Sequence, residues 1–94
     1  MNIDDFIWLP DIVDKLTVKH HATQDEVEEI FFNHPKYRFT ESGHHPGEDV
    51  YAALGQTDAG RYLVVFFIRK ASNRALILSA RDMDQKERKR YERK

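Results

Sequence analysis

The stretch Tyr62-Leu-Val-Val-Phe-Phe-Ile68 decides the fold, because it is the longest apolar run in the chain. A continuous run of this length is typical of a central strand that is covered on both faces. A second apolar run, Ala75-Leu-Ile-Leu-Ser-Ala80, follows the turn residues Ser72 and Asn73. The sequence therefore predicts two neighbouring strands at the centre of a sheet.

Shorter strands are predicted upstream of this pair. Apolar and polar residues alternate over residues 37–41, and residues 50–54 form a short apolar run that ends at Gly55. Residues 42–47 are a loop by composition, and residues 56–60 suit a hairpin connection. Together, the four segments predict an antiparallel sheet of about four strands.

Helical patterns precede these strands. Residues 11–20 have apolar residues at helical spacing, and Thr23 with Glu26 forms a capping box that starts a second helix. Residues 6–9, which end at Pro10, are expected to form either a short edge strand or an apolar anchor.

A last helix is predicted after the sheet, where Asp82 or Asp84 would cap it. Helices and strands are thus segregated along the chain. The sequence predicts an α+β fold in one domain, residues 1–94.

The composition excludes several classes of protein. There is no cysteine, which excludes disulfides, thiolate metal sites and cysteine nucleophiles. No apolar run reaches the ~18–20 residues of a membrane span, and the first residues lack the features of a signal peptide, so a cytoplasmic protein is expected. Neither a Walker loop nor G-x-G-x-x-G nor G-x-S-x-G occurs, and no cofactor is expected.

Charge is distributed unevenly along the chain. Residues 1–60 contain four Lys or Arg and twelve Asp or Glu, whereas residues 61–94 contain eleven and four. This asymmetry favours a partner that recognises charge, such as a nucleic acid or an oppositely charged protein. The alternative is that the two parts neutralise each other in the fold.

The segment from Lys86 to Lys94 is the most basic part of the chain. Its arginines, Arg88 and Arg90 among them, suit phosphate groups, and Tyr91 would either stack on a base or pack on the sheet. The alternative is a solvated face of the last helix.

Three arginines lie at the ends of the central strands. Arg81 stands at the entry to the last helix, whose N–H groups would help it hold an anion. Arg69 ends the neighbouring strand, and Arg74 follows the turn. If the two strands pair, Arg69 and Arg74 lie near the turn and Arg81 lies nearer the opposite end. Each of them could instead form a surface ion pair.

The histidines offer acid–base chemistry. His20, at the end of the first predicted helix, would act either as a general acid or base or as a cation at the helix dipole. His44 and His45 precede Glu48 and Asp49, and such a cluster suits either proton transfer or a metal. Because no spacing such as H-E-x-x-H occurs, no metal is expected.

The run Ile77-Leu-Ser-Ala-Arg81, followed by Glu87-Arg88 and Tyr91, resembles a pattern of BrnT-type toxins, which are RelE-like ribonucleases of type II toxin–antitoxin pairs. The further matches, in family order, are Phe6-Ile-Trp8, Lys19-His20, Glu28-Glu-Ile-Phe-Phe-Asn33, His45, Glu48-Asp49, Ala53-Leu-Gly55 and Gly60-Arg-Tyr-Leu-Val-Val65. The resemblance covers nearly the whole chain.

This resemblance implies two helices, a twisted antiparallel sheet and a C-terminal helix, which agrees with the predicted order. It also implies metal-independent RNA cleavage, in which a base activates the ribose 2′-hydroxyl, cations stabilise the transition state and an acid protonates the leaving oxygen. The implied partner is a small antitoxin with a DNA-binding segment.

The resemblance and the basic C-terminal part lead to one hypothesis for the site. Arg69 and Arg81 would bind the scissile phosphate, and His20 or Asp49 would act as the general base or acid. The residues that position the RNA would be Tyr91, Arg74, Lys86, Arg88 and Arg90.

Two positions depart from the family pattern. Val50 stands where an arginine is common, and Leu76 where a basic residue is common. Transition-state cations contribute ~3–4 kcal/mol each. The alternative function is therefore a catalytically impaired toxin fold that binds its antitoxin. A structural or metal-sensing protein that uses the histidines is a third possibility.

Overall fold

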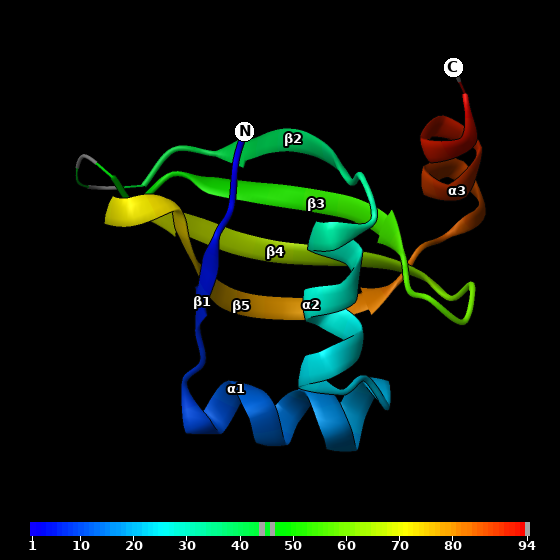
Figure 1. Ribbon diagram of the computed structural model, residues 1–94, viewed down its shortest axis with the longest axis horizontal. Coiled ribbons are helices and arrows are strands. Elements are labelled where there is room, and N and C mark those ends of the chain that lie inside the picture. Colours follow the sequence, from blue (N-terminus) through cyan, green and yellow to red (C-terminus); the bar gives the residue numbers. More distant parts are fainter. Residues whose placement is uncertain (44, 46, 94) are drawn as a thin grey trace.

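The fold is α+β, as predicted, and its described residues contain a five-stranded sheet (Figure 1). The computed structural model describes residues 1–43, 45 and 47–93. In chain order the elements are β1 (Asp5–Ile7), α1 (Pro10–Lys15), the π-helix η1 (Leu16–His20), α2 (Gln24–Phe32), β2 (Lys36–Glu41), β3 (Val50–Gln56), β4 (Tyr62–Lys70), the 3₁₀ turn η2 (Ala71–Asn73), β5 (Arg74–Asp82) and α3 (Gln85–Glu92).

The sheet has the strand order β1-β5-β4-β3-β2. The four predicted strands are confirmed as the antiparallel meander from β2 to β5. A fifth strand, β1, pairs in parallel with the start of β5, so that Phe6 lies opposite Ala75. Of the two alternatives for the N-terminal apolar segment, the edge strand is therefore correct, and the sheet is mixed.

The first helix begins at Pro10, one residue before the predicted start. Proline suits the first turn of a helix because its missing N–H would be unpaired there. From Leu16 onward the helix widens into the π-helix η1, and the Ala22 N–H donates to the Leu16 carbonyl over 3.1 Å. Together, α1 and η1 run alongside the β5 edge of the sheet (Figure 1).

Capping boxes start both of the other helices. In α2, Thr23 accepts from the Glu26 N–H over 3.1 Å and Glu26 accepts from the Thr23 N–H over 3.0 Å, as predicted. In α3, Asp84 and Glu87 make the same pair of bonds over 2.8 and 2.9 Å. Asp84, and not Asp82, is thus the cap.

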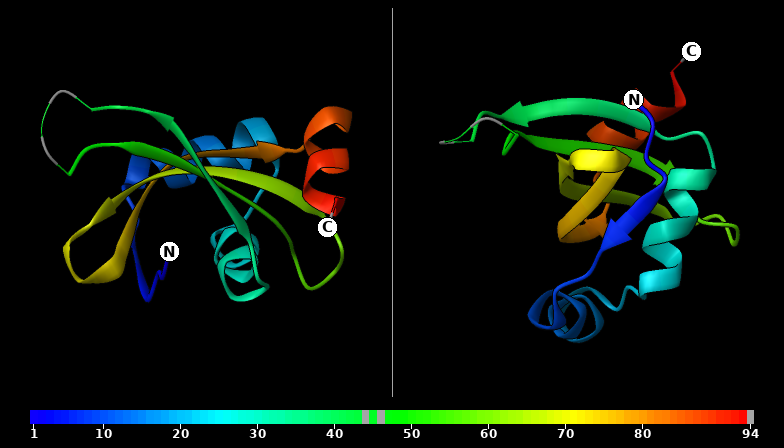
Figure 2. Two further views of the ribbon diagram at one scale, coloured as in Figure 1. Left: turned by 90° about the horizontal axis from the view of Figure 1, so that it is seen from above. Right: turned by 60° about the vertical axis from the view of Figure 1, so that its left-hand side comes forward.

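The two faces of the sheet are covered to different extents. On the α2 face, as we call it, α2 packs through Ile30 against a core that includes Phe67. On the opposite α3 face, α3 covers Leu54 and Val64 at one end of the sheet (Figure 2, left). The prediction that β4 is covered on both faces is therefore correct at Val64 and incomplete at Ile68, which is half-buried.

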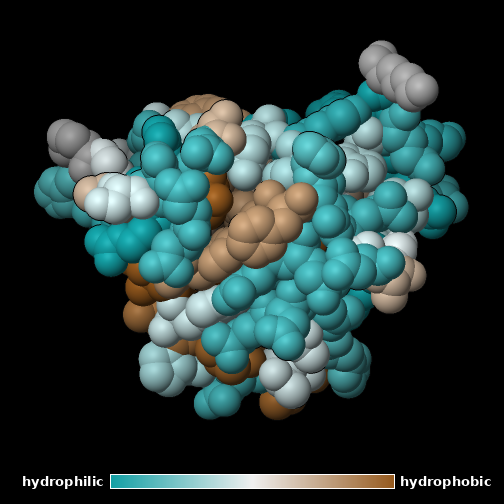
Figure 3. Space-filling model, in the orientation of Figure 1, coloured by the Kyte–Doolittle hydropathy of each residue, from teal (hydrophilic) through white to brown (hydrophobic). Residues whose placement is uncertain are grey.

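The surface on the α2 side is mostly hydrophilic, with apolar side chains gathered near its middle (Figure 3). The most exposed phenylalanine is Phe32, at 65%, and its ring centre lies 6.1 Å from that of Phe6. None of the described helices is long and apolar enough to span a membrane.

Candidate functional site

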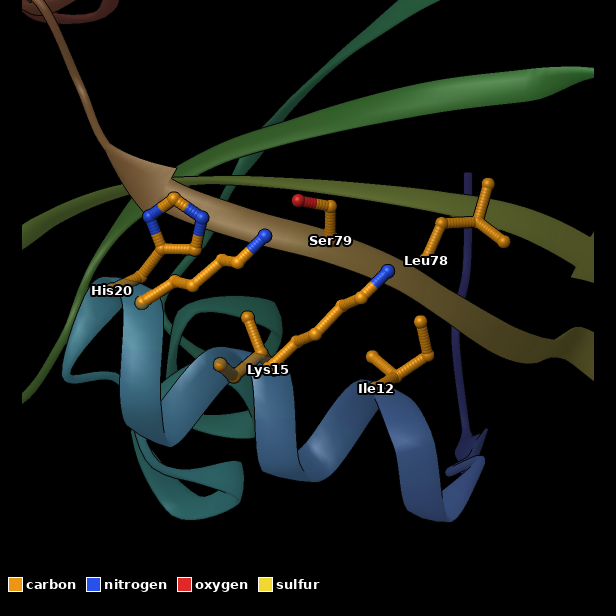
Figure 4. A pocket seen from close by; sticks show the side chains of 7 residues that line it. Ile12, Lys15, His20, Leu78 and Ser79 are labelled. Atoms are coloured by element: carbon orange, nitrogen blue, oxygen red, sulfur yellow. The ribbon is translucent and has the colours of Figure 1, made fainter.

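A pocket of about 250 Å³ lies between the α1–η1 helix and β5. Its lining residues, which define the His20 pocket, are Ile12, Lys15, Leu16, Lys19, His20, Leu78 and Ser79. β1 pairs only with Arg74, Ala75 and Leu76 of β5, which leaves the rest of that strand edge to the helix. In Figure 4, Lys15 and His20 extend from the helix toward β5, which carries Ser79.

Helical spacing brings two cations to this pocket. Residues four apart lie on the same side of a helix, so Lys15 and Lys19 are neighbours, and His20 follows directly. Both lysines are exposed, and neither forms an ion pair with another described residue. Because like charges at this spacing repel each other, an anion bound between them would be favourable.

Arg81 lies two residues beyond Ser79 on β5. Ser79 pairs with Phe66 on β4, and the Arg81 guanidinium carbon lies 5.5 Å from the centre of the Phe66 ring. Both Nη atoms of Arg81 donate to the Glu87 carboxylate over 2.7 and 2.8 Å. The pKa of Glu87 is lowered, mainly by the hydrogen bonds that Arg81 donates to its carboxylate. Glu87 thus accepts two hydrogen bonds from Arg81 and orients its guanidinium group.

The Arg81–Glu87 pair makes the stability of the fold sensitive to acid. The pKa of Glu87 lies below its ordinary value of 4.5. Such a group stabilises the fold above its unfolded pKa, and this contribution is lost as the pH falls through the folded pKa. We expect the free energy of unfolding to fall below pH 4.5 in the wild type, and to fall less in Glu87→Gln.

Urea denaturation at neutral and acidic pH, followed by circular dichroism, measures this effect. The matched control is Glu92→Gln, because Glu92 is about half exposed in its 3.8 Å pair with Arg88. Surface pairs of this kind contribute little to stability. If Glu92→Gln changed the pH dependence as much as Glu87→Gln does, the Arg81–Glu87 pair would not be its source.

A second groove, of about 180 Å³, lies between β2 and α3. Its lining residues are Lys36, Tyr37, Arg38, Leu54, Arg90 and Tyr91. Arg38 pairs with Ala52, which pairs with Phe66, which pairs with Ser79. One row of the sheet thus connects this cationic groove to the His20 pocket.

The candidate residues on α3 differ in their surroundings. The Tyr91 ring lies 6.0 Å from the Tyr62 ring, and burial raises the pKa of Tyr91. Of its two alternatives, packing on the sheet is therefore the one seen. The Arg88 guanidinium stacks over Tyr62 at 4.1 Å, whereas Lys86 is exposed and Arg90 lines the second groove.

The other candidates lie far from the His20 pocket. Asp49 and Arg69 line a separate groove of about 190 Å³. Val64, the partner of Arg81, and Arg69 are five residues apart on β4, or about 17 Å at the rise of a strand. Because strand residues alternate between faces, a separation of five residues also places Arg69 and Arg81 on opposite faces of the sheet. Arg74 lies at the same end of the sheet as Arg69. The hypothesis that Arg69 and Arg81 share one phosphate is therefore wrong.

Among the described residues, no three His, Asp or Glu side chains gather closely enough to hold a metal ion. His34 and His45 are both exposed. His44 and Lys94, which the sequence analysis considered, lie outside the described residues.

Sequence reasoning assigned no role in the site to four of these residues, namely Lys15, Lys19, Ser79 and Glu87. The four-residue spacing of the lysines just before His20 was a signal that could have found the first two. The contact between Glu87 and Arg81 left no such signal, because it depends on where α3 packs.

These features define a class of protein. A small α+β domain with a cationic histidine pocket and further cations across one sheet face is suited to phosphate-bearing ligands such as nucleic acids.

Comparison with known families makes this more specific. The family model of the ribonuclease toxin BrnT, of type II toxin–antitoxin systems, matches residues 8–87, and the chain belongs to this family. The resemblance noted in the sequence is thereby confirmed. The matched segment includes the His20 pocket and the Arg81–Glu87 pair. A search of curated proteins found no match. Family membership implies an antitoxin as the partner.

Proposed function

We propose that the protein is a metal-independent endoribonuclease that cleaves RNA at the His20 pocket. The observation that carries this proposal is the placement of one imidazole beside two ammonium groups and the Ser79 hydroxyl in a pocket of about 250 Å³. Membership of the family supports ribonuclease activity. The lining of the pocket supports the choice of catalytic residues.

His20 is the proton-transfer group in this proposal, because imidazole gains and loses a proton near neutral pH. It takes the proton of the ribose 2′-hydroxyl, whose oxygen attacks the adjacent phosphorus. A bond from phosphorus to the 2′-oxygen forms as the bond to the 5′-oxygen breaks. The leaving 5′-oxygen takes up a proton from water, and the His20 imidazolium later returns its proton to solvent. The products are a 2′,3′-cyclic phosphate and a 5′-hydroxyl end.

Cations stabilise the charge that develops on the phosphate oxygens. Lys15 and Lys19 lie in the pocket itself, and Arg81, which Glu87 orients, holds a neighbouring phosphate on the α3 face. The nucleophile belongs to the RNA, so the reaction does not require a metal. The β2–α3 groove, with Arg90, extends the RNA path.

The proposed setting follows from the same family. A small antitoxin of the DNA-binding type would hold the toxin inactive in the cytoplasm, where both the RNA and the antitoxin are made.

Incubation of the purified protein with RNA, with and without a chelator, tests this function. We expect cleavage in both conditions, and we expect Arg81→Ala to be about 10- to 100-fold slower, because it loses one charge-assisted contact to a phosphate. Arg69→Ala, which removes a guanidinium from the opposite face, is the matched comparison and should cleave at the wild-type rate.

Thermal unfolding must first show that both variants are folded. If the chelator abolished cleavage, the reaction would depend on a metal. If Arg69→Ala alone lost activity, the site would lie in the Asp49–Arg69 groove.

Protein binding without catalysis is a second candidate function. Val50, Ile68 and Leu76 pair with one another across β3, β4 and β5. The two departures from the family pattern therefore lie in one row of the α3 face, and that row is half-buried and apolar. A wild type that cleaves no RNA, does not arrest growth and forms a stable complex with its antitoxin would favour this function.

A further inference from the structure

The side chain of Arg61, directly before β4, joins three parts of the fold. Its Nε and Nη2 atoms donate to Asp82 at the end of β5 over 2.7 and 3.2 Å. Its Nη1 atom lies 3.3 and 3.4 Å from the two carboxylate oxygens of Glu26 in α2. Nη2 and Nη1 also donate to the main-chain carbonyls of His20 and His21 over 2.8 and 2.9 Å.

These bonds occupy the whole guanidinium group. Arginine has five N–H donors. All five are used, by the two carboxylate oxygens of Asp82, the Glu26 carboxylate and the carbonyls of His20 and His21. Two carboxylates neutralise the charge of Arg61. The hydrogen bonds that Arg61 donates to Asp82 are the main cause of the lowered pKa of Asp82. Arg61 is therefore not available to bind a phosphate, unlike the lysines of the His20 pocket.

The two carbonyls that Arg61 binds end the helix that carries His20. The last carbonyls of a helix have no partners within the helix and need them from elsewhere. Here the last turn is a π-helix, and His21 follows in the left-handed region at φ 51°. Neither conformation is favourable for these residues, so contacts from outside must hold the helix end in this shape.

We propose that Arg61 is a positioning residue that fixes the His20 imidazole in its pocket. It acts through the carbonyls of His20 and His21, which it ties to β5 and α2, and it does not touch the RNA. This inference rests on the proposed function of His20. When the carbonyl of the last residue of a helix is held in place, the direction in which that residue's side chain leaves the helix is also fixed.

The test is Arg61→Lys, which keeps the positive charge but has too few donors for this set of acceptors. We expect kcat for RNA cleavage to fall about 10- to 100-fold, as for a misplaced catalytic group, with KM little changed. The matched control is Asn33→Ala. Asn33 also ties a helix end to a carbonyl, that of Gln56 over 3.0 Å, but it lies at the end of α2. This control should cleave at the wild-type rate.

A double-mutant cycle separates positioning from general destabilisation. In a His20→Gln background, Arg61→Lys should slow the residual cleavage no further, because the group that it positions is gone. The same factor in both backgrounds would overturn the inference.

The ¹H–¹⁵N resonances of the His20 ring give a readout that does not depend on activity. Arg61→Lys should shift or broaden them, whereas Asn33→Ala should not. Unchanged His20 resonances in Arg61→Lys would overturn the inference even if activity fell. If His20→Gln retained full activity, the proposed function would fail, and the resonances alone would decide whether Arg61 positions the ring.

Discussion

RNA cleavage by His20→Gln is expected to be about 10²–10⁴-fold slower than by the wild type, the usual contribution of a positioned acid–base group. Glutamine keeps the polar character and approximate length of histidine but has no proton to exchange near neutral pH. His20 is half-buried between the helix and β5, and cations surround it in the pocket. The other ionisable side chains that line this pocket are those of Lys15 and Lys19.

The measurement is the rate of RNA cleavage as a function of pH. The residual rate of His20→Gln should depend on pH differently from the wild-type rate, because the variant lacks the imidazole. His21→Asn is the matched control, because His21 is exposed outside the pocket and asparagine tolerates its left-handed backbone. If His21→Asn lost activity while His20→Gln stayed fully active, His21 and not His20 would be the proton-transfer group.

The elements of the fold were predictable because each has a local cause. The apolar run 62–68 identifies β4, the Thr23–Glu26 box starts α2, and the segregation of helices and strands gives the class. The parallel pairing of β1 was not predictable in the same way. It depends on a contact between Phe6 and Ala75, which lie far apart in the chain, and only the edge position was anticipated.

His20 and Arg81 were predicted from the sequence as site residues, but the lysines beside His20 and the arrangement of the site were not. The register between β4 and β5 shifts, so that Phe66 pairs with Ser79 and Phe67 with Ile77, which leaves Leu78 as an extra residue. Strand residues alternate between faces, so strict alternation from Ile77 would place Arg81 on the α2 face. The extra residue turns Ser79 and Arg81 to the α3 face instead. Nothing in the local sequence around Leu78 indicates this irregularity.

The free energy of unfolding is expected to fall by about 3–5 kcal/mol in Phe67→Ala, the cost of removing a buried phenylalanine ring. Phe67 is fully buried on the α2 face. Its ring centre lies 5.3, 5.9 and 6.0 Å from those of Phe31, Tyr37 and Tyr51. Three aromatic rings from α2, β2 and β3 would lose their common contact, and rigid strands around them limit how far the space can close.

Urea denaturation followed by circular dichroism measures this loss, with Phe39→Ala as the control. Phe39 lies on the same face and contacts Tyr51, but it is 53% exposed, so its removal should cost much less. Domains of this size have ~5–15 kcal/mol of stability in total. Phe67→Ala would thus lower the folded fraction of the protein, with every residue of the His20 pocket still present. Equal costs for the two variants would show that the aromatic cluster around Phe67 is not the centre of the core.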